Sequence, residues 1–246
     1  IVVPPATTKG TVSITIRKPS AVTLTLDDLE GAGLFSEATA VSTGVASWDK
    51  KLIDLYEAAN YATFLHQAVL ARKNIIISGA TGSGKTTLSK ALIRHIPEQE
   101  RIISIEDTPE LVISQPNHVR LFYSKGGQGL AKIGVKDLLE SCLRMRPDRI
   151  LLQELRDGAA FYYIRNVNSG HPGSITTVHA DSAQLAFEQL TLLVKESEGG
   201  RDLARDDIRA LLRAAIDVII QCKRSDGRFL VTEIYFEPSV RSKSAR

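Results

Sequence analysis

The sequence has little that would favour a membrane span, a disulfide framework or a nucleic-acid surface. Its 246 residues include only two cysteines, Cys142 and Cys222, which lie far apart and form no C-x-x-C pair. Their number argues against a zinc knuckle and fits a reducing cytoplasm. No apolar run approaches the ~18 residues that a membrane-spanning helix needs. The net charge is only +3, and the 6% of aromatic residues are not interleaved with a basic run, so no base-stacking groove is predicted.

What the sequence does contain is a phosphate-binding P-loop. The segment 79–86 matches the pattern G-x-x-x-x-G-K-[ST], and it follows an apolar run at 74–78 and precedes a segment with helical periodicity. Backbone N–H groups of such a loop surround the β-phosphate, Lys85 reaches the β- and γ-phosphates, and the Thr86 hydroxyl ligates Mg²⁺. The residues predicted to bind ATP are Gly79, Ala80, Thr81, Gly82, Ser83, Gly84, Lys85, Thr86 and Thr87.

The organisation of the chain before the P-loop predicts a second, incomplete domain. The first 35 residues alternate polar and apolar side chains, with strands expected at 11–17 and 22–26. Two or three strands cannot form an independent core, and the chain starts with Ile1 rather than Met. We therefore expect residues 1–35 to be the C-terminal part of an N-terminal domain whose start is missing. Residues 36–47 are small and polar, as in a linker, and residues 48–246 are predicted to form the ATPase domain.

Within residues 48–246, apolar strands alternate with helices, which predicts an α/β fold with a mostly parallel sheet. A long amphipathic helix is expected at 48–72. Further strands are expected at 74–78, 101–105, 149–153 and 173–178, and further helices at 85–95, 135–145, 157–168 and 182–196. Near the end, apolar runs at 218–222 and 229–234 flank an Asp-Gly turn and predict a β-hairpin.

Charged and polar residues follow three of these strands. Glu106 and Glu154 each end an apolar strand, where open α/β sheets build their ligand sites. A carboxylate there can hold Mg²⁺ or its water, or orient the attacking water. His179 ends a third strand and is expected at the same edge, where a neutral imidazole could donate a hydrogen bond to a γ-phosphate. A structural histidine and acidic helix caps, above all at Asp107 and Asp157, are the alternatives.

The chain contains four sequence boxes, in this order: a P-loop at 79–86, an aspartate box at 105–111, a Walker-B-type box at 146–156, and a histidine box at 170–173 and 176–180. Together they resemble the boxes of the type II/type IV secretion ATPase superfamily. The resemblance covers about residues 45–236. Within the superfamily the chain most resembles the hexameric VirB-type traffic ATPases of bacterial type IV secretion systems, a subgroup favoured by residues 107–111, the compact loop at 124–134 and the Gly-His-Pro-Gly run at 170–173. The type II secretion and pilus-extension relatives usually carry a tetracysteine zinc module, which two isolated cysteines cannot build. Gln153 departs from the family pattern, which usually has glycine before the glutamate.

The resemblance implies a RecA-like core with a C-terminal hairpin, preceded by the remnant of a β-containing N-terminal domain. It also implies roles for single residues. Glu106 resembles the general base or water-positioning residue, Glu154 a support for Mg²⁺ or its waters, and His179 a γ-phosphate sensor. Arg146 resembles an arginine near a subunit boundary, and Arg17 one that the N-terminal domain presents to the nucleotide. A surface ion pair is the alternative for each arginine, and Arg120, Arg144 and Arg156 are further candidates.

By the same resemblance, the protein is expected to hydrolyse ATP with Mg²⁺ as a homo-hexamer that powers substrate translocation or pilus assembly. It would be cytoplasmic and peripheral at the inner-membrane face, in contact with inner-membrane secretion components, and without nucleic-acid specificity. A RecA-type nucleic-acid motor and a non-hydrolysing scaffold subunit are the alternatives, and a small-molecule kinase is less favoured because no acceptor motif is evident.

Overall fold

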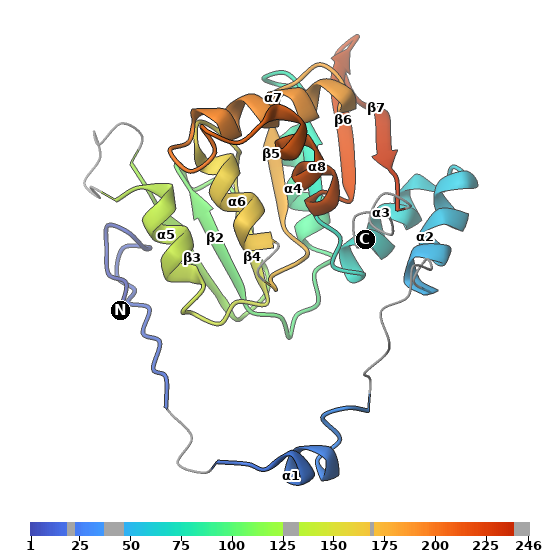
Figure 1. Cartoon of the computed structure of the whole chain (residues 1–246). Coiled ribbons are helices and arrows are strands. Elements are labelled where there is room, and N and C mark those ends of the chain that lie inside the picture. Colours follow the sequence, from blue (N-terminus) through green and yellow to red (C-terminus); the bar gives the residue numbers. More distant parts are fainter. Residues whose placement is uncertain (19–22, 37–46, 125–132, 168–169, 239–246) are drawn as a thin grey trace.

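The structure is a computed structural model that describes residues 1–18, 23–36, 47–124, 133–167 and 170–238. Most of the linker expected at 36–47 therefore lies outside the described residues. In the described part, helices cover both faces of a central β-structure (Figure 1). The α/β class with mostly parallel strands is confirmed. Among the described residues, none of the helices combines the length and the apolar character needed to span a bilayer.

The strands form two hydrogen-bonded sheets that meet edge to edge. One sheet has the order β3-β2-β4 and the other the order β5-β1-β6-β7, and all the neighbouring pairs are parallel except β6 and β7. The sheets join where the backbone N–H of Leu155 donates to Thr177 O (2.8 Å) and Thr177 Oγ1 donates to Gln153 O (3.1 Å). The strands are β1 (Ile75–Ser78), β2 (Ile102–Glu106), β3 (His118–Phe122), β4 (Arg149–Leu152), β5 (Ile175–Val178), β6 (Val218–Ser225) and β7 (Arg228–Phe236).

Two hydrophobic clusters, one on each face, hold the helices to the sheet. Because side chains alternate along a strand, Ile76 of β1 packs into one cluster with α5 to α8, while Ile75 and Ile77 pack into the other with α2 to α4. Burial on both faces explains why the central strands are continuous apolar runs. The helices are α1 (Leu26–Gly31), α2 (Ser47–Glu57), α3 (Tyr61–Leu70), α4 (Lys85–Ile93), α5 (Val135–Cys142), α6 (Ala159–Val167), α7 (Ala183–Glu196) and α8 (Arg205–Ala215).

The expected long helix at 48–72 is wrong, because the chain forms α2 and α3 with a sharp break between them. Ala59 adopts a left-handed backbone conformation (φ 54°), and the N–H of Asn60 donates back to Leu55 O. The break folds α3 back so that the Phe64 ring lies 5.5 Å from Tyr56 and 5.0 Å from Phe236. Three of the described elements, α1, β3 and α8, were not predicted from the sequence.

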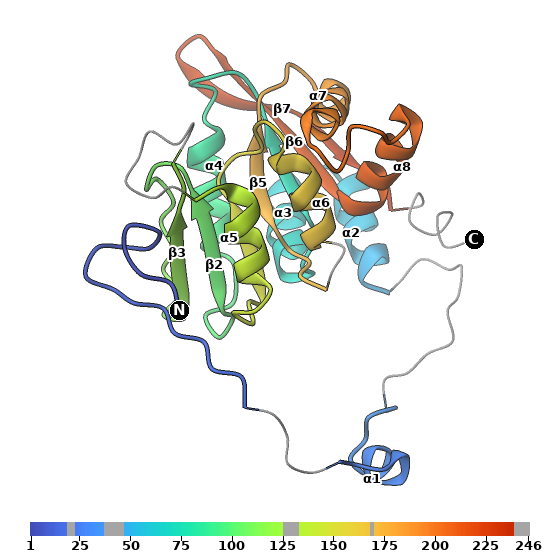
Figure 2. The same ribbon diagram turned by 60° about the vertical axis from the view of Figure 1, so that its left-hand side comes forward.

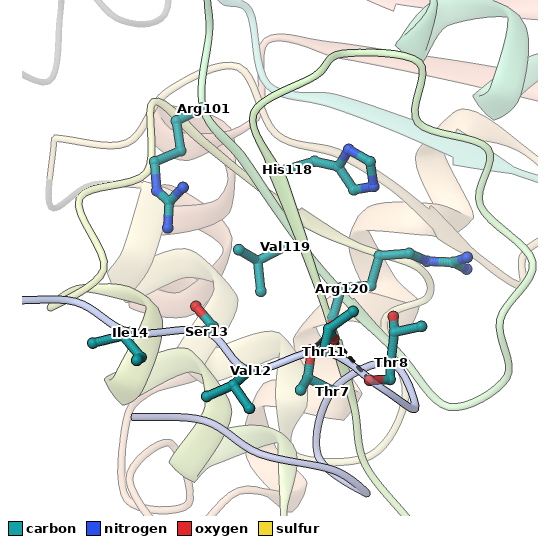
Figure 3. Close-up of a pocket in the computed structure, with 10 residues that line it drawn as sticks. All are labelled: Thr7, Thr8, Thr11, Val12, Ser13, Ile14, Arg101, His118, Val119 and Arg120. Carbon is teal, nitrogen blue, oxygen red and sulfur yellow. Dashed lines mark hydrogen bonds between the residues drawn. The ribbon is translucent and has the colours of Figure 1, made fainter.

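The N-terminal segment also differs from the prediction. In place of strands at 11–17 and 22–26, its described residues form isolated bridges, Val2 with Ser13 and Thr7 with Leu121, and the short helix α1. Residues 2–13 lie along the outer edge of β3 (Figures 1 and 2), where the N–H of Phe122 donates to Ala6 O at 3.0 Å. A cavity of about 530 Å³ separates this segment from the first half of β3 (Figure 3). The boundary of an N-terminal domain at residue 35 stays a prediction.

Candidate nucleotide site

The P-loop connects β1 to α4 and wraps around the N-terminus of that helix. Gly84 is the residue before the first helical turn and has φ +92°, which L side chains rarely adopt. Gly79 lies so close to Cys222 O and Ser83 Oγ that a Cβ there would overlap both atoms. These two glycines let the loop curl tightly, and the first N–H groups of α4, which have no partner within the helix, can face an anion.

A cavity of about 180 Å³ opens beside this loop and brings together residues from four strand ends. The carboxyl ends of parallel strands meet at one edge of a sheet, so segments distant in sequence converge here. The lining residues are Thr81, Gly82, Lys85, Thr86, Ser89, Glu110, Leu111, Gln153, Glu154, Arg156, Thr177 and His179. Six of the predicted site residues line this cavity, namely Thr81, Gly82, Lys85, Thr86, Glu154 and His179. The other predicted residues are not among those that line it, namely Gly79, Ala80, Ser83, Gly84, Thr87, Glu106, Arg17 and Arg146.

Lys85 is buried, with 8% of its surface exposed, and it lies over the loop carbonyls. Its Nζ donates to Gly79 O (2.7 Å) and Ala80 O (2.9 Å) and is 3.3 Å from His179 Nδ1. Burial lowers the pKa of this ammonium, and the nearby Glu154 carboxylate partly offsets that effect. A bound polyphosphate would supply the counter-charge that two neutral carbonyls do not.

Glu154 is held by charged neighbours on both sides. Its Oε2 accepts a hydrogen bond from the Arg156 guanidinium (2.5 Å). The hydrogen bond to Glu154 raises the pKa of Arg156, whose guanidinium also lies 3.5 Å from the Asp107 carboxylate. Its Oε1 lies 3.0 Å from His179 Nε2, but the approach does not meet hydrogen-bond geometry, so this buried oxygen has no hydrogen-bond partner. This carboxylate oxygen and the Thr86 hydroxyl belong to residues that line the same cavity, and both are oxygen donors of the kind that Mg²⁺ takes.

Glu106 occupies a different environment from the one predicted for a general base. It is fully buried, and its carboxylate accepts hydrogen bonds from the Ser104 hydroxyl, twice from Arg120, and from the backbone N–H groups of Glu110 and Leu111, at 2.7 to 3.0 Å. A carboxylate with five donors has no lone pair left to direct a water. The sixth residue of the same box, Glu110, is exposed and lines the cavity instead. The feature of the sequence that could have pointed to Glu110 is that it is a second carboxylate, after Asp107, in the segment that follows β2.

Arg17 and Arg146 lie away from the P-loop. They line a separate cavity of about 840 Å³ together with Arg144 and His171. Arg144 and Arg146 lie on the segment that precedes β4. That segment is at the amino ends of the strands, the opposite edge of the sheet from the P-loop. Gln153, the departure from the family pattern, faces the nucleotide cavity, and its side-chain oxygen accepts a hydrogen bond from the N–H of Asp107 (3.2 Å).

Comparisons with known proteins agree with this geometry. The profile of the family described as "Type II/IV secretion system protein" matches residues 50–230. The chain belongs to this family. The Type IV secretion system protein VirB11 of Bartonella henselae is 64% identical over 97% of this chain and 70% of its own length. The resemblance to the VirB-type traffic ATPases is therefore confirmed, and the chain is an ATP-hydrolysing enzyme.

A solved structure supports the same assignment. The crystal structure of the VirB11 ATPase from the Brucella suis type IV secretion system, in complex with sulphate, superimposes with a TM-score of 0.90 and 43% identity, covering 98% of this chain and 74% of that chain. The pilus retraction motor PilT with bound ADP has a TM-score of 0.55 at 21% identity over 83% of this chain and 58% of its own, which is a likeness of fold alone.

Proposed function

We propose that this chain is the motor subunit of a bacterial type IV secretion system, in which a homo-hexamer couples ATP hydrolysis to substrate translocation or pilus assembly. The observation that carries the proposal is the cavity in which Lys85 and Thr86 of the P-loop face Glu154 and His179. The 64% identity to a VirB11 protein supports the biological setting. Such a motor would be cytoplasmic, in peripheral contact with inner-membrane secretion components.

In the proposed mechanism, Lys85 and the N–H groups of residues 82–87 bind the β- and γ-phosphates. Thr86 and the unpartnered oxygen of Glu154 would hold Mg²⁺, which when bound would neutralise phosphate charge. Glu110 takes the proton of the attacking water, in place of Glu106, because Glu110 is exposed and lines the cavity. Glu106 acts indirectly, by fixing the backbone of Glu110.

His179 lies where it can report the state of the γ-phosphate. It is 3.3 Å from Lys85 Nζ and 3.0 Å from Glu154 Oε1, between the P-loop and the end of β4. When Lys85 turns from the loop carbonyls to the phosphates, its contact with His179 changes. Loss of the γ-phosphate would reverse that change, which is the kind of local event that drives domain movement in NTPases.

Arg146 and Arg17 are proposed to act on the nucleotide of a neighbouring subunit. Both are exposed and lie at the sheet edge opposite their own P-loop. An arginine that completes a phosphoryl-transfer site from outside adds about 10³–10⁵ to the rate, which would make turnover depend on ring assembly.

The proposal is tested by Lys85→Ala, with Lys90→Ala on the same helix as the matched control, because Lys90 does not line the cavity. Phosphate release from ATP and oligomeric state are measured for both variants. We expect Lys85→Ala to lose at least about 100-fold of the rate, as expected for removing a charge-stabilising donor, and the control to retain it. Full turnover by Lys85→Ala would contradict the proposal. Stimulation by single-stranded DNA that falls steeply with salt would favour a nucleic-acid motor instead.

A further inference from the structure

An exposed aromatic side chain lies at the N-terminus of the P-loop helix and has no part in the mechanism above. Phe229, the second residue of β7, is 57% exposed, yet one edge of its ring rests on the P-loop. A Cβ built on Gly84 would lie 3.0 Å from two of its ring atoms. The exposed part of Phe229 is therefore apolar surface directly beside the N-terminus of the P-loop helix.

A β-bulge aims this side chain at the P-loop. The pairing of β6 with β7 shifts register between Gln221 and Cys222, so that β7 contains one extra residue. On the C-terminal side of the bulge, the even-numbered residues Ile234 and Phe236 pack with α2 to α4. On its N-terminal side, the odd-numbered residue Val231 lines a cavity with Leu88 and Leu92 of α4. Alternation then places Phe229 on the α4 side and Leu230 on the opposite side. Without the bulge, Leu230 would take the place of Phe229.

The direction of a bound triphosphate can be read from the charges around Lys85. Glu154 and His179 stand on the side of β1 that faces β5 and β4, and they mark where the γ-phosphate and its metal lie. The nucleoside must therefore leave in the opposite direction, toward the neighbours of β1 on its other side, β6 and β7. Phe229 is located there.

Arg224 adds a positive charge to the same place. It pairs with Phe229 across the hairpin, and its guanidinium carbon lies 5.6 Å from the centroid of the phenyl ring. More than half of the Phe229 side chain stays exposed despite Gly84 and Arg224, which leaves a ring face for a flat ligand. Base–aromatic stacking and a nearby arginine are the combination by which proteins hold nucleobases without reading their edges.

We propose that Phe229, supported by Arg224, is the platform on which the purine base of the bound nucleotide stacks. The inference rests on the proposed function, since it extends the P-loop site by a base subsite. Because stacking does not read the edges of the base, this platform gives affinity for a purine nucleotide without strong choice between adenine and guanine.

The test separates the base from the phosphates by using two ligands, Mg²⁺–ADP and Mg²⁺–tripolyphosphate, which has no base. Binding is measured by calorimetry for the full chain and for Phe229→Ala, Phe229→Trp and Leu230→Ala. Leu230 is the matched control, because it is the next residue, 44% exposed, and on the other face of the hairpin. We expect Phe229→Ala to bind ADP about ten-fold more weakly and to bind tripolyphosphate with unchanged affinity. Phe229→Trp and Leu230→Ala should bind both ligands with the affinity of the unsubstituted chain.

Two results would overturn the platform. ADP affinity that is unaltered in Phe229→Ala would show that no base rests there, and an equal loss for both ligands would show that the ring only shapes the P-loop. In either case the unchanged chain still binds tripolyphosphate, so the proposed function stands. An unchanged chain that bound neither ligand would overturn both proposals.

Discussion

At the scale of single residues, Glu110 and Glu106 are four positions apart but differ completely in environment. Glu110 is exposed in the nucleotide cavity, whereas Glu106 is buried among five donors. We expect Glu110→Gln to lower kcat by about 10²–10⁴, the range for loss of a general base, with little change in nucleotide affinity. Steady-state phosphate release and ADP calorimetry on the same preparation measure both quantities.

Glu106→Gln is the matched control for this prediction, because it makes the same chemical change at the buried position. The new amide group would point a donor at Arg120 or at the backbone N–H groups, which are donors themselves. We expect it to lower the free energy of unfolding by about 3 kcal/mol, as for a broken buried charge pair. A Glu106→Gln chain that is as stable as the unchanged one but inactive, beside an active Glu110→Gln chain, would return the role of base to Glu106.

At the scale of secondary-structure elements, one buried side chain ties three strands together. Asn74, just before β1, accepts hydrogen bonds from the N–H groups of Gly173 and Ser174 at the start of β5, and donates to Ala215 O just before β6. We expect Asn74→Leu to lower the free energy of unfolding by about 3 kcal/mol, because it leaves buried backbone groups unpaired. Urea unfolding measures this loss.

The control for Asn74→Leu is Asn117→Ala. Asn117 also accepts a hydrogen bond, from Arg101, but it is exposed, so its loss should cost less than about 0.5 kcal/mol. Since Asn74 lies at the edge opposite the P-loop, kcat per folded molecule should not change. An Asn74→Leu chain as stable as the control would mean that water or a local shift satisfies the freed groups.

The central strands were predicted correctly because burial on both faces sets their pattern, and the β6–β7 hairpin was predicted from its turn. β1, β2, β4 and β5 are short apolar runs, and Asp226 and Gly227 adopt the positive φ angles (51° and 76°) expected of the hairpin turn. β3 escaped prediction because only Leu121 of its five residues is buried. The break at Ala59 has no glycine or proline to mark it, so local sequence could not reveal it.

The same limit explains how far the candidate site could be predicted. Sequence spacing correctly brought Lys85, Glu154 and His179 to one sheet edge, because the ends of parallel strands must converge. It could not decide between Glu106 and Glu110, because that choice depends on Arg120, which β3 brings to Glu106 from the neighbouring strand. Pairings between strands distant in sequence leave no local pattern.

At the scale of the whole molecule, a continuous series of contacts joins the N-terminal segment to the nucleotide cavity. The Thr7 hydroxyl donates to the backbone of Arg120, the Arg120 guanidinium holds Glu106, and Glu106 holds the backbone of Glu110. Contiguity of this kind is a physical route by which movement of the N-terminal segment could displace the proposed base. It gives a motor a way to link hydrolysis to domain position.

Division of labour between subunits can be tested by mixing two inactive proteins. Lys85→Ala destroys the P-loop but keeps Arg146, and Arg146→Ala does the reverse. A complete site then needs an intact P-loop from one subunit and an intact Arg146 from its neighbour in a head-to-tail ring. When equal amounts of the two variants are assembled together, about one quarter of the sites should be complete by chance. Phosphate release from the mixed ring measures the recovery.

Lys85→Ala mixed with Glu110→Gln is the control, because both residues line the cavity of one chain and neither can be supplied by a neighbour. Recovery no greater than in that control, or an Arg146→Ala protein that is active alone, would contradict a role for Arg146 across the subunit boundary.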